Sequence, residues 1–167
     1  MKALTSLRKT IDTVLSCAFG LLFAFMVCIG TYQIVTRYFF NSPSTVSEEL
    51  LTYSFTWMAL LASAYVFGKR DHMRMGFLAD KVTGTPKLIL ETVIELLIMA
   101  MVGCVMIFGG FSIMKLTMTQ STASLGIPMG VIYTILPVSG ILIFVYGILN
   151  IIDLWNGVSR EQREVKE

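Results

Sequence analysis

Long stretches without a charged residue alternate with short charged segments along this chain of 167 residues. Three uncharged stretches cover 13–36, 50–68 and 96–114, and a fourth lies within 116–152. A hydrocarbon core of about 30 Å needs roughly 20 apolar helical residues, so each stretch is long enough to cross a bilayer. None alternates with a period of two, which disfavours a transmembrane barrel. Because hydrocarbon demands internal bonding of every backbone group, the pattern predicts an all-α integral membrane protein with four transmembrane helices.

The whole chain, 1–167, is interpreted as a single four-helix membrane domain. Its spans are predicted at about 13–36, 50–68, 90–114 and 131–152. We expect the third helix to start near Lys87, and Pro137 to kink the fourth because proline lacks a backbone donor. The spacing Thr45-x-x-Glu48 is typical of a capping box, which would start the second helix. The charged tail, 153–167, is expected to be frayed.

The loop 69–87, between spans two and three, contains a short amphipathic pattern. Apolar residues recur on one helical face at Met75, Leu78, Ala79 and Val82. Arg74 and Lys81 lie off this face. We therefore predict a short amphipathic interfacial helix that lies in the membrane surface.

The distribution of positive charge predicts the orientation. Of the 13 lysines and arginines, all but Arg37 and Lys115 lie in the N-terminal segment, the middle loop or the tail. Positive residues are retained on the cytoplasmic side, so both termini and the loop 69–87 are predicted to be cytoplasmic. The first apolar run is too long for a signal-peptide core and no small-residue cleavage site follows it, so we expect this span to be retained.

Composition narrows the class of protein further. The chain is 55% hydrophobic but only 14% charged, whereas soluble domains average about 25% charged residues. A net charge of +2 is too small for a nucleic-acid-binding surface. The three cysteines all fall within spans, where we expect small buried apolar side chains rather than a disulfide framework. These features exclude an ordinary cytosolic enzyme, a disordered tail, a secreted disulfide-rich domain and a nucleic-acid binder.

The sequence offers little catalytic or metal-binding chemistry. Its single histidine, His72, lies in a loop and is interpreted as a surface or interface residue, so a bis-histidine haem site is excluded. We find no nucleotide-binding glycine motif and no convincing nucleophile–base pair. The middles of the four spans contain no ionisable residue, which argues against ion transport by this chain alone. We therefore predict no enzymatic activity, cofactor or metal.

A few charged and aromatic residues are candidates for contacts with partners. Arg37 on one side of the first outer turn, and Glu48 and Glu49 on the other, either form a salt bridge or remain solvated. Trp57 needs a partner for its indole N–H, or it lies against the interface or lipid. Glu91 is one turn from Glu95, and this pair meets either a partner's cation or water.

Two further groups are candidates, one for contacts with lipid headgroups and one for close contacts between helices. The candidate lipid headgroup contacts are Lys69, Arg70, Arg74 and Lys81. Small residues that permit close helix approach occur at Gly20 with Ala24, at Ala59 with Ser63, and at Gly109-Gly110.

Several motifs in fixed order resemble the small membrane subunit, of the DctQ/SiaQ type, of tripartite ATP-independent periplasmic (TRAP) transporters. The matching motifs are Gln33-x-x-x-Arg37-Tyr38-x-x-Asn41, Glu48-Glu49, Trp57, the basic segment from Lys69 to Arg74 with His72, and Leu125-Gly126-Ile127-Pro128 followed by Tyr133 and Pro137. The chain departs from the family pattern at Val46, Gly76 and Gly130, where the family often has tryptophan, aspartate and tryptophan respectively.

The resemblance implies a function within a complex. A periplasmic solute-binding protein would capture an organic acid, such as a dicarboxylate or sialic acid. A large multi-span permease subunit would move that acid inward by an elevator motion driven by a sodium gradient. The small subunit would be a fixed, non-catalytic brace in the bacterial inner membrane, in contact with membrane lipids. The main alternative is a self-sufficient oligomeric four-span channel or exporter, and a structural subunit of an unrelated complex also remains open.

Overall fold

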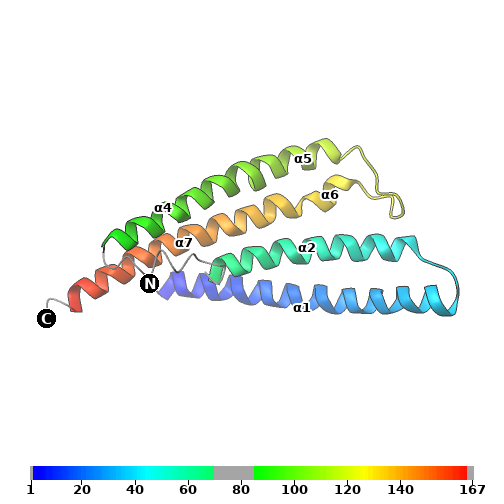
Figure 1. The fold of residues 1–167 in the computed structure, drawn as a ribbon, viewed down its shortest axis with the longest axis horizontal. Coiled ribbons are helices and arrows are strands. Elements are labelled where there is room, and N and C mark those ends of the chain that lie inside the picture. The colour runs from blue at the N-terminus through cyan, green and yellow to red at the C-terminus, as the bar shows by residue number, and fades with distance from the viewer. Residues whose placement is uncertain (1, 70–84, 165–167) are drawn as a thin grey trace.

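In the computed structural model, long helices lie side by side and are joined at their ends (Figure 1). The structure describes the backbone of 2–69 and 85–164, and the side chains of 6–69, 86 and 88–155. Within these residues 4 helices are long and apolar enough to cross a membrane: Ser6–Phe39, Thr45–Lys69, Leu88–Thr117 and Met129–Trp155. The prediction of an all-α membrane protein with four spans is confirmed. The predicted interfacial helix lies outside the described residues, as do His72, Arg70, Arg74 and Lys81.

Helices α1 (Lys2–Phe39) and α2 (Thr45–Lys69) form a hairpin. Asn41 has a φ of 49°, a left-handed conformation that asparagine tolerates well and that often ends a helix. The second helix is capped one residue earlier than predicted. The Ser44 hydroxyl accepts hydrogen bonds from the Ser47 backbone N–H at 3.4 Å and from the Ser47 hydroxyl at 2.9 Å. Ser44 is thus the N-cap, and Thr45 is already helical.

The third span is one long helix with a local change of winding. It comprises α4 (Thr85–Val102), the π-helix η1 (Gly103–Gly109) and α5 (Gly110–Thr117). It begins close to the predicted start, with Pro86 in its first turn, where a missing N–H costs nothing. The π-helical turns lie at the centre of the span, and the sequence did not predict them.

The fourth span is interrupted near its beginning. Helix α6 (Met129–Tyr133) ends at Thr134, and α7 (Ile135–Glu164) continues from there. Pro137 has no N–H to offer the Tyr133 carbonyl, which explains the predicted kink. Helix α7 continues through the first part of the charged tail, as far as Glu164. The expected fraying of the tail stays a prediction.

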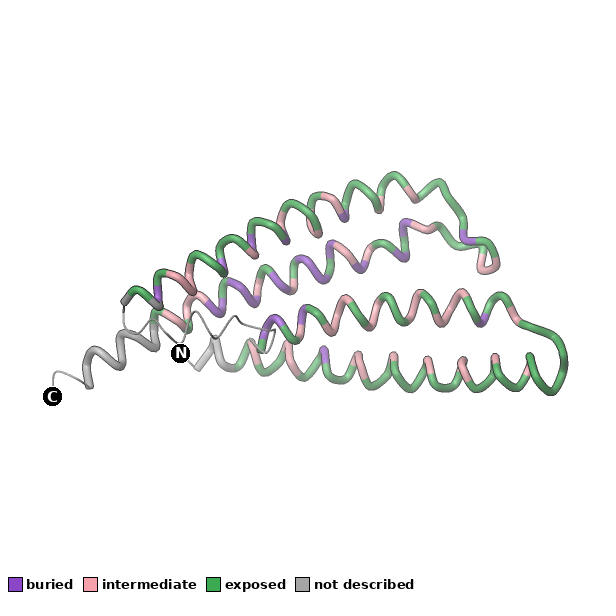
Figure 2. The backbone as a smooth tube through the Cα atoms, viewed as in Figure 1, coloured by how far each residue is buried: buried purple, intermediate pink, exposed green. Residues whose placement is uncertain are grey.

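Helix α7 is the centre of the bundle, between α2 on one side and α4 on the other (Figure 1). One helical face of α7 contains the buried residues Ile135, Ser139, Ile143, Tyr146 and Asn150. A second face contains the buried glycines Gly140 and Gly147. Half of its most apolar window is buried, at 50%, against 6% for the first span. Figure 2 shows the same concentration of buried positions along α7. The first helix therefore leaves most of its surface to lipid or to another chain.

Glycines allow α7 to approach its neighbours closely. A Cβ atom added to Gly68 would lie 2.5 Å from Tyr146 Cε1, and one on Gly147 would lie 2.8 Å from Met99 Cγ. Gly110, predicted as a flat spot, would place a Cβ 3.0 Å from Pro137 Cδ. In contrast, Gly20 has nothing within 4 Å. Among the described residues, nothing therefore packs closely against Gly20 on the first helix.

The three cysteines correct another expectation. Cys17, Cys28 and Cys104 are exposed rather than buried. Two of them lie on α1, which has few contacts with the other helices except α2. The three cysteines therefore lie on the outer surface of the bundle and not in its core.

Candidate functional site

Polar side chains gather at the two ends of the bundle. We call the end that contains 40–44 and 118–128 the turn end, and the end where both termini lie the terminal end (Figure 1). Among the described side chains, no group of three histidines, cysteines or carboxylates could hold a metal ion. The polar side chains at each end hold helices and loops together, and we assign them a structural role.

At the turn end, the Glu49 carboxylate holds the loop that follows α5. It accepts backbone hydrogen bonds from Ala123 at 3.0 Å, Ser124 at 3.0 Å and Leu125 at 2.9 Å. The Tyr53 hydroxyl donates a further bond to Glu49 at 3.1 Å. Bonds to a charged acceptor are stronger than neutral ones, so α2 fixes three successive residues of a distant loop.

The loop 118–128 also has its own internal bonds. The Thr122 N–H donates to the Ile127 carbonyl at 2.8 Å, and the Met129 N–H donates to the Gln120 carbonyl at 2.7 Å. The Thr122 hydroxyl is buried and accepts a bond from the Ile127 N–H at 3.2 Å. Gly126 has a φ of 67°, which glycine adopts without strain. The loop is therefore a compact turn and not a loose connection.

Trp57 finds its partner inside the chain. Its indole N–H donates to the Ile132 carbonyl at 3.1 Å, close to the break between α6 and α7. One turn earlier on α2, the Tyr53 hydroxyl lies 3.8 Å from Met129 Sδ. Trp57 and Tyr53 thus attach α2 to α6 and the start of the fourth span.

Arg37 and Glu48 remain on the surface of the turn end. Both are exposed, and within the described residues Arg37 makes no ion pair with Glu48 or Glu49. The suggested salt bridge across the first turn is not formed, because Glu49 is directed to the other loop. Arg37 lies in the last turn of α1, where a cation is favoured by the helix dipole.

At the terminal end, Arg8 joins three helices. Its Nη1 lies 2.8 Å from Asp153 Oδ2, and its Nη2 donates to Asn150 Oδ1 at 2.9 Å. The same Nη2 also donates to the Gly68 carbonyl at the end of α2. The planar guanidinium presents several fixed donors, which suits one side chain that must reach three acceptors.

Two more contacts extend this cluster to all four spans. Asn150 Nδ2 donates to Glu95 Oε1 at 3.3 Å, which brings in α4. The Tyr146 hydroxyl donates to Asp12 Oδ1 at 2.5 Å, which ties α7 to α1 again. Asn150 and Tyr146 are fully buried, and Glu95 is 7% exposed. We call these residues, with Arg8 and Asp153, the terminal polar network.

The sequence analysis missed most of this network. Arg8 was used only to predict orientation, and Asn150 was treated as part of an uncharged span. Glu95 was singled out, and the structure places it against Asn150 of its own chain. The available signal was the position of Asn150, at helical spacing from Ile143 and Tyr146 on the buried face of α7.

Lys69 is the one candidate headgroup residue in the described part of the chain. Its Nζ lies 4.5 Å from the centre of the Tyr65 ring, a cation–π distance. Tyr65 also packs edge-on against Phe19, with ring centres 5.5 Å apart. This aromatic pair links α1 to α2 near the terminal end.

A family model and two curated proteins that are similar to this chain all point to the same kind of transporter subunit. The family described as "Tripartite ATP-independent periplasmic transporters, DctQ component" matches residues 26–157. The sialic acid TRAP transporter small permease protein SiaQ of Vibrio cholerae is 29% identical over 140 residues, which cover 79% of this chain and 81% of that protein. A protein of Haemophilus influenzae named as a TRAP transporter small permease protein is 28% identical over 121 residues, or 72% of this chain and 74% of that protein.

Proposed function

Since this chain belongs to the DctQ component family of tripartite ATP-independent periplasmic transporters, we propose that it serves as the scaffold of a large multi-span permease subunit. The chain is a small TRAP permease subunit, a multi-pass inner-membrane transport component and not a catalyst. The positions of the polar contacts support the scaffold role. They fix the helices at both ends, while the middles of the spans contain no ionisable group that could carry an ion.

We propose further that the complex imports an organic acid, a carboxylate such as a dicarboxylate or sialic acid. A periplasmic solute-binding protein delivers the acid, and a sodium gradient drives its uptake. The relative from Vibrio cholerae, named for sialic acid, supports an acidic solute. The small subunit contributes no solute site of its own, and the large subunit carries out the movement.

The proposed orientation places the terminal end in the cytoplasm and the turn end in the periplasm. The excess of lysine and arginine in the termini and in the loop 69–87 supports it. In this orientation Lys69, Arg70, Arg74 and Lys81 contact anionic headgroups of the inner leaflet. The turn-end loop 118–128 faces the side from which the binding protein arrives.

In this arrangement the four candidate interface residues divide into two roles. Glu49 and Trp57 position the turn-end loop and the start of the fourth span, because their polar atoms are used within the chain. Arg37 and Glu48 are exposed, and they contact the large subunit or the binding protein directly.

Reconstitution tests the scaffold role against the alternative of a self-sufficient channel. Vesicles that contain this chain alone should accumulate no labelled organic acid. Vesicles that also contain the large subunit, with the binding protein outside and a sodium gradient, should accumulate it. Uptake by the chain alone would favour the channel, and full uptake by the large subunit without this chain would contradict the scaffold.

A further inference from the structure

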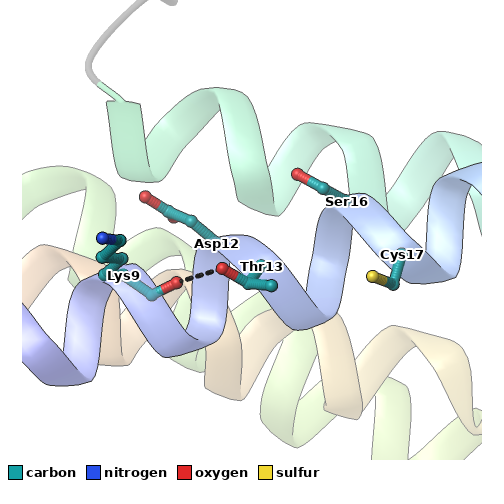
Figure 3. Close-up of a pocket in the computed structure, with 5 residues that line it drawn as sticks. All are labelled: Lys9, Asp12, Thr13, Ser16 and Cys17. Carbon is teal, nitrogen blue, oxygen red and sulfur yellow. Dashed lines mark hydrogen bonds between the residues drawn. The ribbon is translucent and has the colours of Figure 1, made fainter.

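A shallow depression of about 360 Å³ lies on the surface of α1 near the terminal end (Figure 3). It is lined by Lys9, Asp12, Thr13, Ser16 and Cys17. The charged residues of the terminal polar network lie at the same end of the helix, so we expect the depression at the depth where headgroups meet hydrocarbon. Atoms that line an empty depression lack van der Waals partners. At this depth the surface of a helix contacts lipid, which can fill the depression.

The depression offers an exposed cation. Lys9 is exposed and forms no ion pair with the described residues, whereas the preceding Arg8 is directed inward to Asp153 and Asn150. The Thr13 hydroxyl donates to the Lys9 carbonyl at 2.8 Å, as Figure 3 shows, so its proton is used within α1. The Lys9 ammonium is therefore available to a phosphate group.

The depression also offers a carboxylate, that of Asp12, whose position is fixed by a hydrogen bond from α7. Asp12 Oδ1 accepts the bond from Tyr146, whose side chain is completely buried. Within the described residues Asp12 forms no ion pair that would neutralise its charge. A carboxylate and an ammonium that line the same depression suit a ligand that carries both a phosphate and an ammonium.

Polarity falls along the helix from Lys9 to Cys17. The order is an ammonium and a carboxylate, then the hydroxyls of Thr13 and Ser16, then a thiol, over about 12 Å of helix. Ser16 points towards α2 in Figure 3. On α2, Tyr65 forms side-chain hydrogen bonds with Ser16 and with Lys69. This gradient parallels that of a phospholipid from headgroup through glycerol to acyl chain.

We propose that this depression binds one phospholipid with a phosphate and a primary ammonium in its headgroup, of the phosphatidylethanolamine type. Lys9 contacts the phosphate, Asp12 contacts the ammonium, and Ser16 and Cys17 lie along the glycerol and the first acyl carbons. The inference depends neither on the orientation of the chain nor on its scaffold role.

Retention of lipid tests the headgroup contacts. Native mass spectrometry of the full chain from detergent should show one retained phosphatidylethanolamine. K9Q and D12N should each reduce that retention about tenfold, the loss that matches one charge-assisted contact. In D12N the amide carbonyl still accepts the Tyr146 hydroxyl, so a folded variant is expected. Lys115→Gln, an exposed lysine on α5, should leave retention unchanged.

Cross-linking at Cys17 identifies the occupant. In a chain whose Cys28 and Cys104 are replaced by serine, a photoreactive maleimide on Cys17 should give an adduct with the mass of phosphatidylethanolamine. The same reagent on a chain that keeps only Cys28 is the control for general lipid contact, because Cys28 lies outside the depression. A Cys17 adduct with another polypeptide, equal retention of phosphatidylglycerol, or retention unaffected by K9Q and D12N would each overturn the proposal.

Discussion

Glu49 shows how a single residue shapes the turn end. Neighbouring positions on α2 have different surroundings, since Glu48 is exposed whereas Glu49 receives three backbone N–H groups of 123–125. Sequence alone marked both glutamates as candidates, because both lie beside the first outer turn. It could not tell them apart, since the distinction depends on a loop more than 70 residues away.

Replacement of Glu49 by glutamine should loosen this loop. A glutamine has one acceptor oxygen and no charge, so it cannot retain all three bonds to 123–125. We expect amide hydrogen exchange at 123–125 to become about tenfold faster. Glu48→Gln is the matched control and should leave exchange there unchanged. Equal protection in the Glu49 variant would show that the loop's internal bonds are sufficient.

Among the elements, the helices were predictable and their contacts were not. The length of an uncharged stretch is enough to predict a transmembrane helix, and Pro137 is enough to predict an interruption. Both predictions work because they depend only on residues that are neighbours in the sequence. The pairing of Arg8 with Asn150 and Gly68 depends on α7 lying between α2 and α4, which no local pattern specifies. The outward direction of Cys17 depends on the same arrangement.

The N-terminal part of α1 should depend on Arg8. This helix has few contacts with α7, so each of them matters. Arg8→Gln leaves Asn150 and the Gly68 carbonyl without their charged donor. We expect a loss of about 2 kcal/mol in stability, the range for a buried polar partner left unsatisfied. Hydrogen exchange should accelerate in 6–15 and remain unchanged at the turn end. Arg8→Lys should recover only part of the loss, because lysine lacks the planar fork. Loss of protection along the whole chain would contradict a local role.

For the molecule as a whole, the orientation is the property on which the proposed contacts depend. Lysine and arginine are unevenly distributed along the sequence: most lie in the N-terminal segment, the loop 69–87 and the tail, and the segments around the turn end contain only Arg37 and Lys115. In a chain with all three cysteines replaced by serine, Ser42→Cys places a thiol at the exposed turn end, and Ser6→Cys places one at the exposed terminal end.

A maleimide that cannot cross membranes should label Ser42→Cys in spheroplasts and leave Ser6→Cys unlabelled. Inside-out vesicles should give the opposite result, and detergent-solubilised protein should label at both positions. The natural cysteines are exposed and make no disulfide, so their replacement by serine should not disturb packing. Labelling of Ser6→Cys in spheroplasts would place the basic end outside, and the turn-end loop held by Glu49 would then face away from any periplasmic binding protein.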